Sequence, residues 1–502
     1  MNGGTYVLVV VGILMAKCVG FLRDIVFAST FGASPLTDIY FQIFSLASLV
    51  FTGIGGALST LVIKKLNKPE NTMDSGRSYV ASFISKTALV VIGVTAVLYV
   101  FSGAAVDFLL PGLEASLHDE AVQIMHIMLP SCLFVIVAYI MSGVLQNRNV
   151  FFVTSIMSLP YNVIIIASLM VPNVNLMTVS IVTTIGWFLH IAILMPAFFK
   201  KGYSFFGSIK GSKTGGADNR EVLYIFISSM MFQLVFMADK AAVSADSGAA
   251  TTINYASNLF VTISSVFVVA MSNVSYPALC RHYESGDIGS VRQSLRYILT
   301  VLLVIFAPFI LTVNCFGENI ISLLYQRGEF TAELSQVTAT LFALYTFGIF
   351  GYVCQELLNK ILYLDSKYTY TVIGTLVVVI SKPIINMFAG SAVAVAGCTA
   401  VMFTAYAVCI LFAIKKTIGN YVNKAFIKNV VKIALASLAA LIAYFGLGFL
   451  PLPLADTKIG FVIPLCVCGT VYLAVLWGTG CLRYIANRRN MAGGSESISC
   501  GG

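Results

Sequence analysis

Charged side chains are scarce in this sequence: Asp, Glu, Lys and Arg together make up 10% of its 502 residues, whereas hydrophobic residues make up 58%. Soluble domains contain about 25% charged residues. Together with a mean hydropathy of +0.92, this scarcity excludes a water-soluble fold. The sequence also lacks a His-rich tract, a glycine-rich phosphate loop and a zinc-spaced motif, and its four histidines are isolated. The eleven cysteines show no paired spacing and are interpreted as small packing residues.

Apolar runs of about 20 residues, each long enough to cross the ~30 Å hydrocarbon layer of a bilayer, recur along the whole chain. They predict an all-α integral membrane protein with about fourteen transmembrane helices. The predicted spans are 5–31, 36–63, 78–103, 121–146, 150–171, 176–199, 221–245, 251–280, 297–315, 336–363, 368–389, 392–414, 429–449 and 459–482.

Lys and Arg are unevenly distributed among the predicted loops. With the N-terminus placed in the cytoplasm, twenty-three of these residues fall on the cytoplasmic side and two, Arg327 and Lys458, fall outside. Cytoplasmic loops of membrane proteins carry such an excess. We therefore predict a multi-pass protein of the cytoplasmic membrane with both termini in the cytoplasm. The same bias accounts for the net charge of +9, which is no indication of nucleic-acid binding.

Two parts of the chain are similar to one another. "STFGAS" near residue 32 has a counterpart in "SADSGAA" near 248, and "DFLLPGLEA" has one in "SLLYQRGEF". These matches place Gly32 and Gly248, and also Gly112 and Gly328, 216 residues apart. The constant offset predicts two pseudo-symmetric six-helix lobes with the substrate path between them. The predicted domains are an N-lobe at 1–200, a cytoplasmic linker at 201–220, a C-lobe at 221–416, spans 13 and 14 at 417–485 as a C-terminal extension, and a disordered cytoplasmic tail at 486–502.

Several charged residues fall inside predicted spans, although each charge near the bilayer centre costs roughly 2.5–3.5 kcal/mol on insertion scales. Lys17 lies ~18 Å into the first span, at 1.5 Å per residue, and Lys382 lies similarly deep in the eleventh. Such deep cations usually face a water-filled cavity, where they attract an anion. Residues nearer the ends of spans could instead reach the interface or pair locally. This alternative applies to Arg23, Asp24, Asp239, Lys240 and Lys86, whereas Glu356 and Lys360, spaced i and i+4, are expected to form a structural pair.

The second span carries a polar stripe, since Asp38, Gln42 and Ser45 are spaced i, i+4 and i+7. In the second lobe, Asp239 and Lys240 occupy the repeat positions of the Arg-Asp pair of the first span, with the signs reversed.

Three motifs resemble signatures of a known family. "GFLRDIVFASTFGASPLTDIYF", "MADKAAVSADSGAATTINYASNLF" and "YQRGEFTAE" are similar to segments of the lipid II flippase MurJ (MviN) family, within a group that includes polysaccharide exporters and multidrug antiporters. The resemblance implies a transporter that moves an undecaprenyl-pyrophosphate-linked sugar-peptide across the bacterial cytoplasmic membrane by alternating access, for cell-wall synthesis. It further implies a monomer in contact with membrane lipids, with no enzymatic activity, no cofactor and no metal centre.

Carried over position by position, the resemblance also implies a cationic cavity that holds the pyrophosphate and the acidic head group. It assigns substrate binding to Lys17, Arg23, Asp24, Asp38 and Asn258, and coupling or ion binding to Asp239, Lys382 and Asn386.

The chain departs from the family pattern within this predicted site. Phe51 and Asn258 stand where the family has arginines, which makes the expected cavity less basic. Lys382 lies near the family's presumed sodium site, so coupling to membrane potential, H⁺ or Na⁺ stays open. Because an ammonium could occupy the place of the ion, we predict that Lys382 meets Asp239 as a tethered positive charge.

Three other functions remain as alternatives. The chain could flip another undecaprenyl-linked glycan, such as a capsule, O-antigen or teichoic-type precursor. A multidrug or cation antiporter would need an acidic, aromatic cavity, against which Lys17 and Arg23 argue. A membrane glycosyltransferase or polymerase would need a large hydrophilic loop with paired carboxylates or metal ligands, and the longest polar loop, of about twenty residues, has neither.

Overall fold

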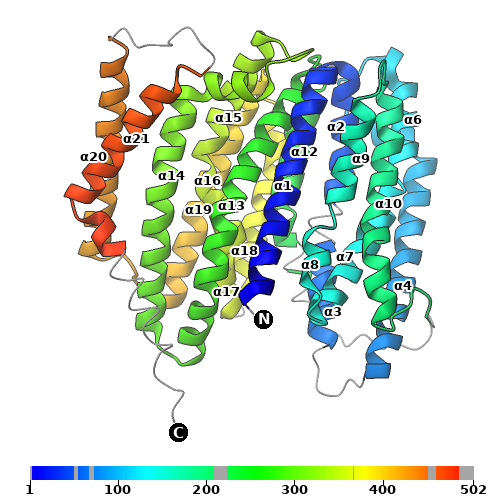
Figure 1. Cartoon of the computed structure of the whole chain (residues 1–502), viewed down its shortest axis with the longest axis horizontal. Coiled ribbons are helices and arrows are strands. Elements are labelled where there is room, and N and C mark those ends of the chain that lie inside the picture. Colours follow the sequence, from blue (N-terminus) through cyan, green and yellow to red (C-terminus); the bar gives the residue numbers. More distant parts are fainter. Residues whose placement is uncertain are drawn as a thin grey trace. The chain divides into compact units, whose positions relative to one another are not determined.

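The computed structural model describes residues 3–49, 55–66, 73–207, 223–224, 227–365, 367–449 and 459–485. Over these residues all regular elements are helices (Figure 1), as predicted. A bilayer offers no water to backbone N–H and C=O groups, so apolar runs satisfy these groups within helices. In this part of the chain eight helices are long and apolar enough to cross a membrane, or nine when one bent pair counts as a single span. Each of the fourteen predicted ranges contains helix, and the chain is an all-α, multi-pass membrane protein.

Two of the six spans predicted for the first lobe are broken into two helices each. Proline accounts for both breaks, because it lacks the backbone N–H that would continue a helix. Pro130 lies at one break, and Pro160 lies in the first turn after another, where the missing N–H is tolerated. The broken spans are α6 (His118–Met128) with α7 (Ser131–Asn147), and α8 (Phe151–Ser155) with α9 (Leu159–Leu169). The span predicted at 36–63 contains α2 (Pro35–Leu49) and α3 (Gly56–Leu66), and residues 50–54 lie outside the described part of the chain. The others are α1 (Gly3–Phe31), α4 (Met73–Val100) followed by α5 (Ser102–Leu109) and a 3₁₀ turn, η2 (Ala115–Leu117), and α10 (Leu176–Lys200).

In the second half of the chain one predicted span, 336–363, is bent by 55°. Gly348 lies at the bend, where an added Cβ would come within 3.1 Å of the Phe403 side chain. The bent span consists of α15 (Ala332–Phe347), α16 (Ile349–Val353), the π-helical η3 (Cys354–Leu358) and α17 (Asn359–Leu364). The other helices are α12 (Met231–Ala242), α13 (Ala249–Glu284), α14 (Ile288–Tyr325), α18 (Tyr368–Asn386), α19 (Ala392–Ile418), α20 (Lys424–Leu447) and α21 (Val462–Gly478).

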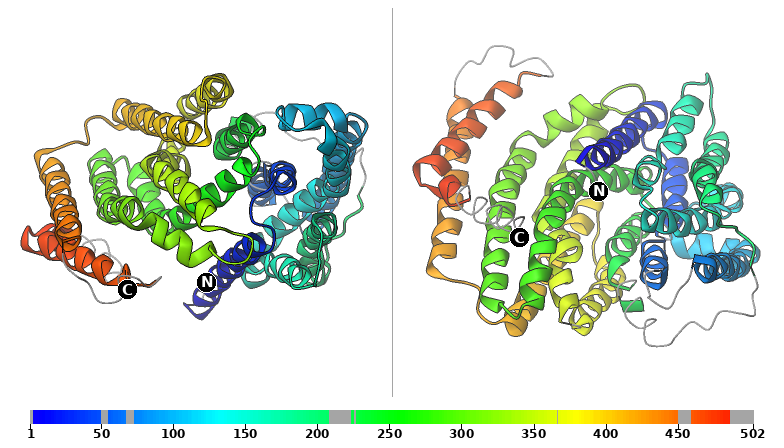
Figure 2. Two further views of the ribbon diagram at one scale, coloured as in Figure 1. Left: turned by 90° about the horizontal axis from the view of Figure 1, so that it is seen from above. Right: turned by 60° about the horizontal axis from the view of Figure 1, so that its bottom comes forward.

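Packing groups the chain into two compact units. In the first unit α10 packs against α7 and α9, and α9 also packs against α1. The core of this unit includes the buried side chains Ile140, Leu194 and Phe198. In the second unit α20 and α21 lie side by side (Figures 1 and 2). The first unit comprises 1–255, 325–334 and 371–398, and the second comprises 256–324, 335–370 and 399–502.

Hydrogen bonds attach the α20–α21 pair to α14 within the second unit. The hydroxyl of Tyr444 donates to the carbonyl of Cys315 at 3.1 Å, and the hydroxyl of Tyr472 donates to the carbonyl of Val304 at 2.9 Å. Phe316 completes the shared apolar core. The last two predicted spans therefore pack against the ninth.

Each lobe contains the same arginine contact at the end of its sixth span. Arg77, near the start of α4, donates to the carbonyl of Lys201 at 3.2 Å, next to a glycine with φ +79°. Arg292, near the start of α14, donates to the carbonyl of Ile418 at 2.5 Å, next to a glycine with φ +80°. The two contacts are related by the repeat offset to within one residue. The recurrence of the contact agrees with the 216-residue repeat of the sequence.

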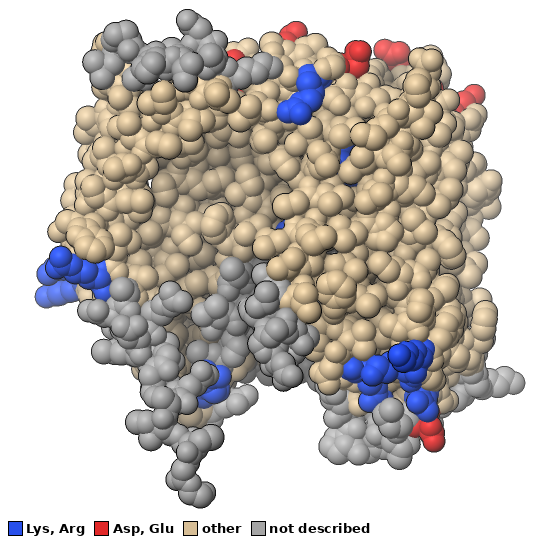
Figure 3. All heavy atoms as spheres, in the orientation of Figure 1, with Lys and Arg blue, Asp and Glu red and all other residues tan. Residues whose placement is uncertain are grey.

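Charged side chains gather at the two ends of the first unit. On the face shown in Figure 3, Lys and Arg gather where α4 begins and α10 ends, with Asp or Glu beside them, and most of the visible Asp and Glu lie at the opposite end. Lys200 and Lys201 are exposed at the basic end, whereas Glu114 and Asp119 are exposed in the loop region between α5 and α6. The α1 helix begins at the basic end (Figures 1 and 3).

Candidate functional site

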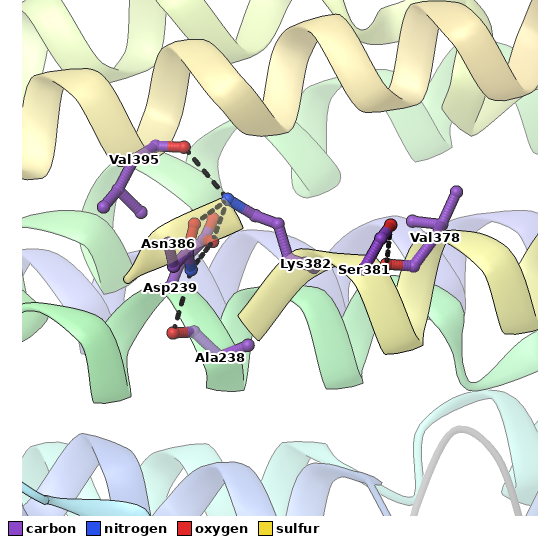
Figure 4. A network of polar contacts seen from close by, with 7 residues as sticks. All are labelled: Ala238, Asp239, Val378, Ser381, Lys382, Asn386 and Val395. Atoms are coloured by element: carbon purple, nitrogen blue, oxygen red, sulfur yellow. Dashed lines mark hydrogen bonds and ion pairs between the residues drawn. The ribbon is translucent and has the colours of Figure 1, made fainter. Parts of the chain in front are cut away.

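A fully buried ion pair joins α12 to α18 (Figure 4). The ammonium of Lys382 lies 2.8 Å from a carboxylate oxygen of Asp239, and both side chains are 0% exposed. Lys382 also donates to the amide oxygen of Asn386 at 2.5 Å and to the carbonyl of Val395, in the first turn of α19, at 3.1 Å. The amide nitrogen of Asn386 donates to Asp239 at 3.1 Å and to the carbonyl of Ala238 at 3.1 Å. The predicted meeting of Lys382 and Asp239 is confirmed.

The three acceptors around Lys382 match the three donors of an ammonium group. They are a carboxylate, an amide oxygen and a backbone carbonyl, which are the oxygen ligands that hard cations prefer. This cluster, called the Lys382 cluster below, therefore surrounds the ammonium of Lys382 with the types of oxygen that bind hard cations. Within the described ranges no group of three or more His, Cys, Asp or Glu residues is placed to hold a metal ion.

Asp38 lies at the N-terminal end of α13. Its carboxylate accepts hydrogen bonds from the backbone N–H of Gly248 at 2.7 Å, from the N–H of Thr251 at 2.6 Å and from the Thr251 hydroxyl at 2.6 Å. The N-terminal N–H groups of a helix have no partner within it and carry partial positive charge, so they favour a carboxylate. Asp38 therefore fastens α2 to α13, and its role in substrate binding stays a prediction.

Lys240 lies one residue after Asp239 and points to different neighbours. It is 3% exposed. Its ammonium donates to the carbonyl of Phe41 at 3.3 Å, to the Ser45 hydroxyl, and to the amide oxygen of Asn254 at 3.3 Å. The first two acceptors belong to α2 and the third to α13.

Two loops of the first unit make equivalent close contacts through glycine. An added Cβ at Gly328, where φ is +57°, would lie against the carbonyl oxygen of Ser29. An added Cβ at Gly112 would come within 2.5 Å of the backbone nitrogen of Ala245. Ser29 and Ala245 are 216 residues apart, as are the two glycines. The two loops that make these contacts are called the interlocked loops below. They lie next to the contact of Asp38 with α13.

The predicted substrate residues of α1 differ in their surroundings. Arg23 pairs with its neighbour Asp24 at 2.6 Å, and the two side chains are 17% and 15% exposed. The guanidinium also lies 5.4 Å from the ring centroid of Tyr161 and 5.9 Å from that of Phe44. Arg23 and Asp24 therefore pair locally, and their role in substrate binding stays a prediction. Lys17 is half-buried on the same helix.

The remaining predicted positions differ in what the structure describes. Asn258 is half-buried on α13, and Phe51 lies outside the described residues. Sequence reasoning left Lys240 out of the predicted site. The feature of the sequence that could have identified Lys240 is the adjacent Asp-Lys pair inside an apolar span. The Val395 carbonyl gave no signal, because a backbone acceptor looks the same at every position.

A helical fold that crosses the membrane many times, with two pseudo-symmetric lobes and ionised residues buried inside its spans, defines a multi-pass membrane transporter. The family model described as "Lipid II flippase MurJ" matches residues 27–464, and the chain belongs to this family.

Curated relatives agree with this assignment. The chain is 25% identical over 441 residues to a probable lipid II flippase MurJ of Thermotoga maritima, covering 85% of this chain and 86% of the relative. It is 22% identical over 362 residues to the lipid II flippase MurJ of Burkholderia cenocepacia, covering 69% and 70%.

Solved structures share the fold. A lipid II flippase MurJ in an inward closed conformation aligns with a TM-score of 0.77 at 22% identity, covering 93% of this chain and 98% of that one. A multidrug resistance MATE family transporter of the MOP superfamily, in an inward-facing conformation, aligns with a TM-score of 0.64 at 10% identity, covering 83% and 98%. An outward-facing MATE transporter aligns with a TM-score of 0.56 at 12% identity, covering 84% and 99%.

Proposed function

We propose that this chain moves lipid II, the undecaprenyl-pyrophosphate-linked precursor of peptidoglycan, from the inner to the outer leaflet of the bacterial cytoplasmic membrane. The observation that carries the proposal is the family match over residues 27–464. Alternating access of two lobes supplies the transport mechanism, and no covalent chemistry is required. The protein works as a monomer among membrane lipids.

The substrate's pyrophosphate binds to Lys17 and Arg23. Both cations lie on α1, six residues or ~9 Å apart along the helix. Asp24 orients the guanidinium of Arg23, and Tyr161 limits its movement. Lysine binds phosphate as a point charge, whereas arginine supplies a planar fork, so the two residues hold the anion in different ways.

The N-terminus lies in the cytoplasm. Support comes from α1, which begins at the end of the first unit where Lys and Arg gather (Figures 1 and 3), as the positive-inside bias requires. A cysteine replacing the exposed Asp119 is then labelled from outside, and one replacing the exposed Lys200 only after permeabilisation. The reverse pattern contradicts the orientation.

The Lys382 cluster couples conformation to an energy source other than sodium. Lys382 supplies the positive charge that a bound ion would otherwise bring, so membrane potential or a proton gradient drives the cycle. The complete set of short contacts around its ammonium supports this assignment.

Complementation of a strain depleted of its lipid II flippase tests the activity. Growth should be restored by the unmodified chain, and lost with Lys17→Ala or Arg23→Ala although each variant inserts in the membrane. Lys200→Ala, which removes an exposed lysine outside the proposed site, is the matched control and should support growth. Full activity of both α1 variants contradicts the pyrophosphate contacts.

A second candidate is a flippase for another undecaprenyl-linked glycan. Asn258 favours it, because this position lacks the positive charge that the family pattern places there. Failure to complement, combined with export of a capsule or teichoic-type precursor by the same chain, supports this candidate over lipid II.

A further inference from the structure

Lys240 is a buried cation whose contacts serve a different purpose from those of the Lys382 cluster. Among the described residues its three acceptors are neutral oxygens, and no carboxylate there accepts a hydrogen bond from the ammonium. A buried charge is tolerated only while it is hydrogen-bonded, and two of the three acceptors, Phe41 and Ser45, lie on α2. Moving α2 away would leave the ammonium with one acceptor.

The α2 helix is fastened to its neighbours by one polar face. Asp38 holds the N-terminus of α13. One turn further, the amide of Gln42 donates to the carbonyl of Met237 on α12 at 3.1 Å and to the carbonyl of Leu109 at 2.7 Å. Ser45, the next residue on this face, accepts from Lys240. All three belong to the polar stripe predicted for this span, so the whole stripe is committed to holding α2 against α12 and α13.

The α12 helix is held on two faces by consecutive residues. Asp239 holds Lys382 and Asn386 of α18, whereas Lys240 holds α2. Consecutive helical residues point about 100° apart, so a small rotation or shift of α12 changes both sets of contacts together. The hydrogen bonds of Lys240 depend steeply on distance and angle.

We propose that Lys240 is a latch that keeps α2 closed against α12 and α13, and that its neighbour Asp239 makes this latch respond to the Lys382 cluster. Lys240 is a positioning residue, since it acts on the position of α2 and touches no substrate. When the ion pair between Lys382 and Asp239 is disturbed, α12 shifts, Lys240 loses its α2 acceptors, and the end of the protein at the interlocked loops opens. The latch goes beyond the proposed flipping activity. It rests on the proposed function only in one respect, since the orientation proposed there makes this end the outer one.

A single cysteine reports on the latch. Thr37 is 1% exposed on α2, and its hydroxyl lies 2.9 Å from that of Thr251 on α13. A cysteine in place of Thr37 is therefore shielded while the latch is closed and reacts with a membrane-impermeant thiol reagent when α2 moves away. Labelling is measured in right-side-out and inverted vesicles, and the chain without the Thr37→Cys change gives the background from native cysteines.

In the Thr37→Cys background, Lys240→Met should raise the labelling rate about tenfold, because it removes hydrogen bonds made by a charged group. Ser45→Ala leaves Lys240 in place and removes one α2 acceptor, so it should raise the rate less, in the same direction. Tyr40→Phe is the matched control. It removes a buried hydrogen bond of α2 to Thr183 on α10, away from the latch, and should leave the rate unchanged.

A double-mutant cycle tests the link to the Lys382 cluster. Asp239→Asn should speed labelling with Lys240 present and have little further effect in Lys240→Met, because both changes act on the same contact. Additive effects overturn the link. A labelling rate that neither Lys240→Met nor Ser45→Ala changes overturns the latch itself, and Ser45→Ala decides alone where Lys240→Met fails to fold. Growth of the complemented strain is scored separately, so failure of the latch is distinguishable from failure of the flippase activity.

Discussion

The Lys382–Asp239 pair stabilises the fold only while both partners are present. Removing one member of a buried pair leaves an uncompensated charge and typically costs 3–5 kcal/mol. We therefore expect Asp239→Asn to lower the apparent unfolding temperature of the purified protein strongly. Asp365→Asn is the control, because Asp365 and Lys367 pair at 2.7 Å while remaining partly exposed, and such pairs contribute about 0–1 kcal/mol.

A double variant separates the pair from its surroundings. Lys382→Met combined with Asp239→Leu removes both charges, and we expect it to unfold at a higher temperature than Asp239→Asn, since no buried charge is left unpaired. Equal unfolding temperatures for Asp239→Asn and Asp365→Asn would contradict the account.

Individual residues were predictable where their chemistry required a partner. Lys382 lies deep in an apolar span and is costly without a partner, and the family resemblance implied a cation site at Asp239, so their meeting could be predicted. For Arg23 the sequence left two interpretations, since a cation near a helix end can bind a ligand or pair locally. The contact of Asp38 with Gly248 was beyond prediction, because it joins residues 210 positions apart and one partner is a backbone N–H.

At the scale of elements, the tight turns depend on glycine for two separable reasons. Gly328 combines a φ of +57° with contact to the Ser29 carbonyl, whereas Gly286, in the turn after α13, has a φ of +73° and open space where a Cβ would lie. A left-handed conformation alone costs a non-glycine residue roughly 1–2 kcal/mol. We therefore expect Gly286→Ala to destabilise by about that amount and Gly328→Ala by more, measured by thermal unfolding. Similar losses at both sites would contradict the close packing of the interlocked loops.

The presence of the helices and the repeat could be predicted from the sequence, whereas the breaks within spans could not. Hydropathy correctly predicted helix in every span, because a single segment that crosses a bilayer can satisfy its own backbone hydrogen bonds only as a helix. The 216-residue offset identified Gly112 and Gly328 before their equivalent contacts were known. Breaks such as the one at Gly348 were missed, since tertiary packing against Phe403 favours the bend and hydropathy does not report packing.

For the whole molecule, the sequence predicted the fold class and the family, but the family pattern described the buried cation site incompletely. The pattern suggests an ion, and this chain supplies a lysine. Only the geometry shows that the ammonium of Lys382 reaches the carboxylate, the amide oxygen and the carbonyl at once. In the coupling that we propose, a substitution of this kind changes what the transporter responds to while leaving its architecture intact.

We expect an energy source other than sodium to drive transport by this chain. Because the ammonium of Lys382 already uses the oxygens of Asp239, Asn386 and Val395, we expect the flipping rate in vesicles to be unchanged when sodium is replaced by potassium at fixed membrane potential. Changing the potential or the pH gradient should alter the rate. Lys382→Ala removes the ammonium and leaves a carboxylate, an amide oxygen and a carbonyl, a ligand set suited to a hard cation, so this variant should acquire sodium dependence. A strong sodium requirement in the unmodified protein would rule out the tethered charge, since a second cation could not share those oxygens with Lys382.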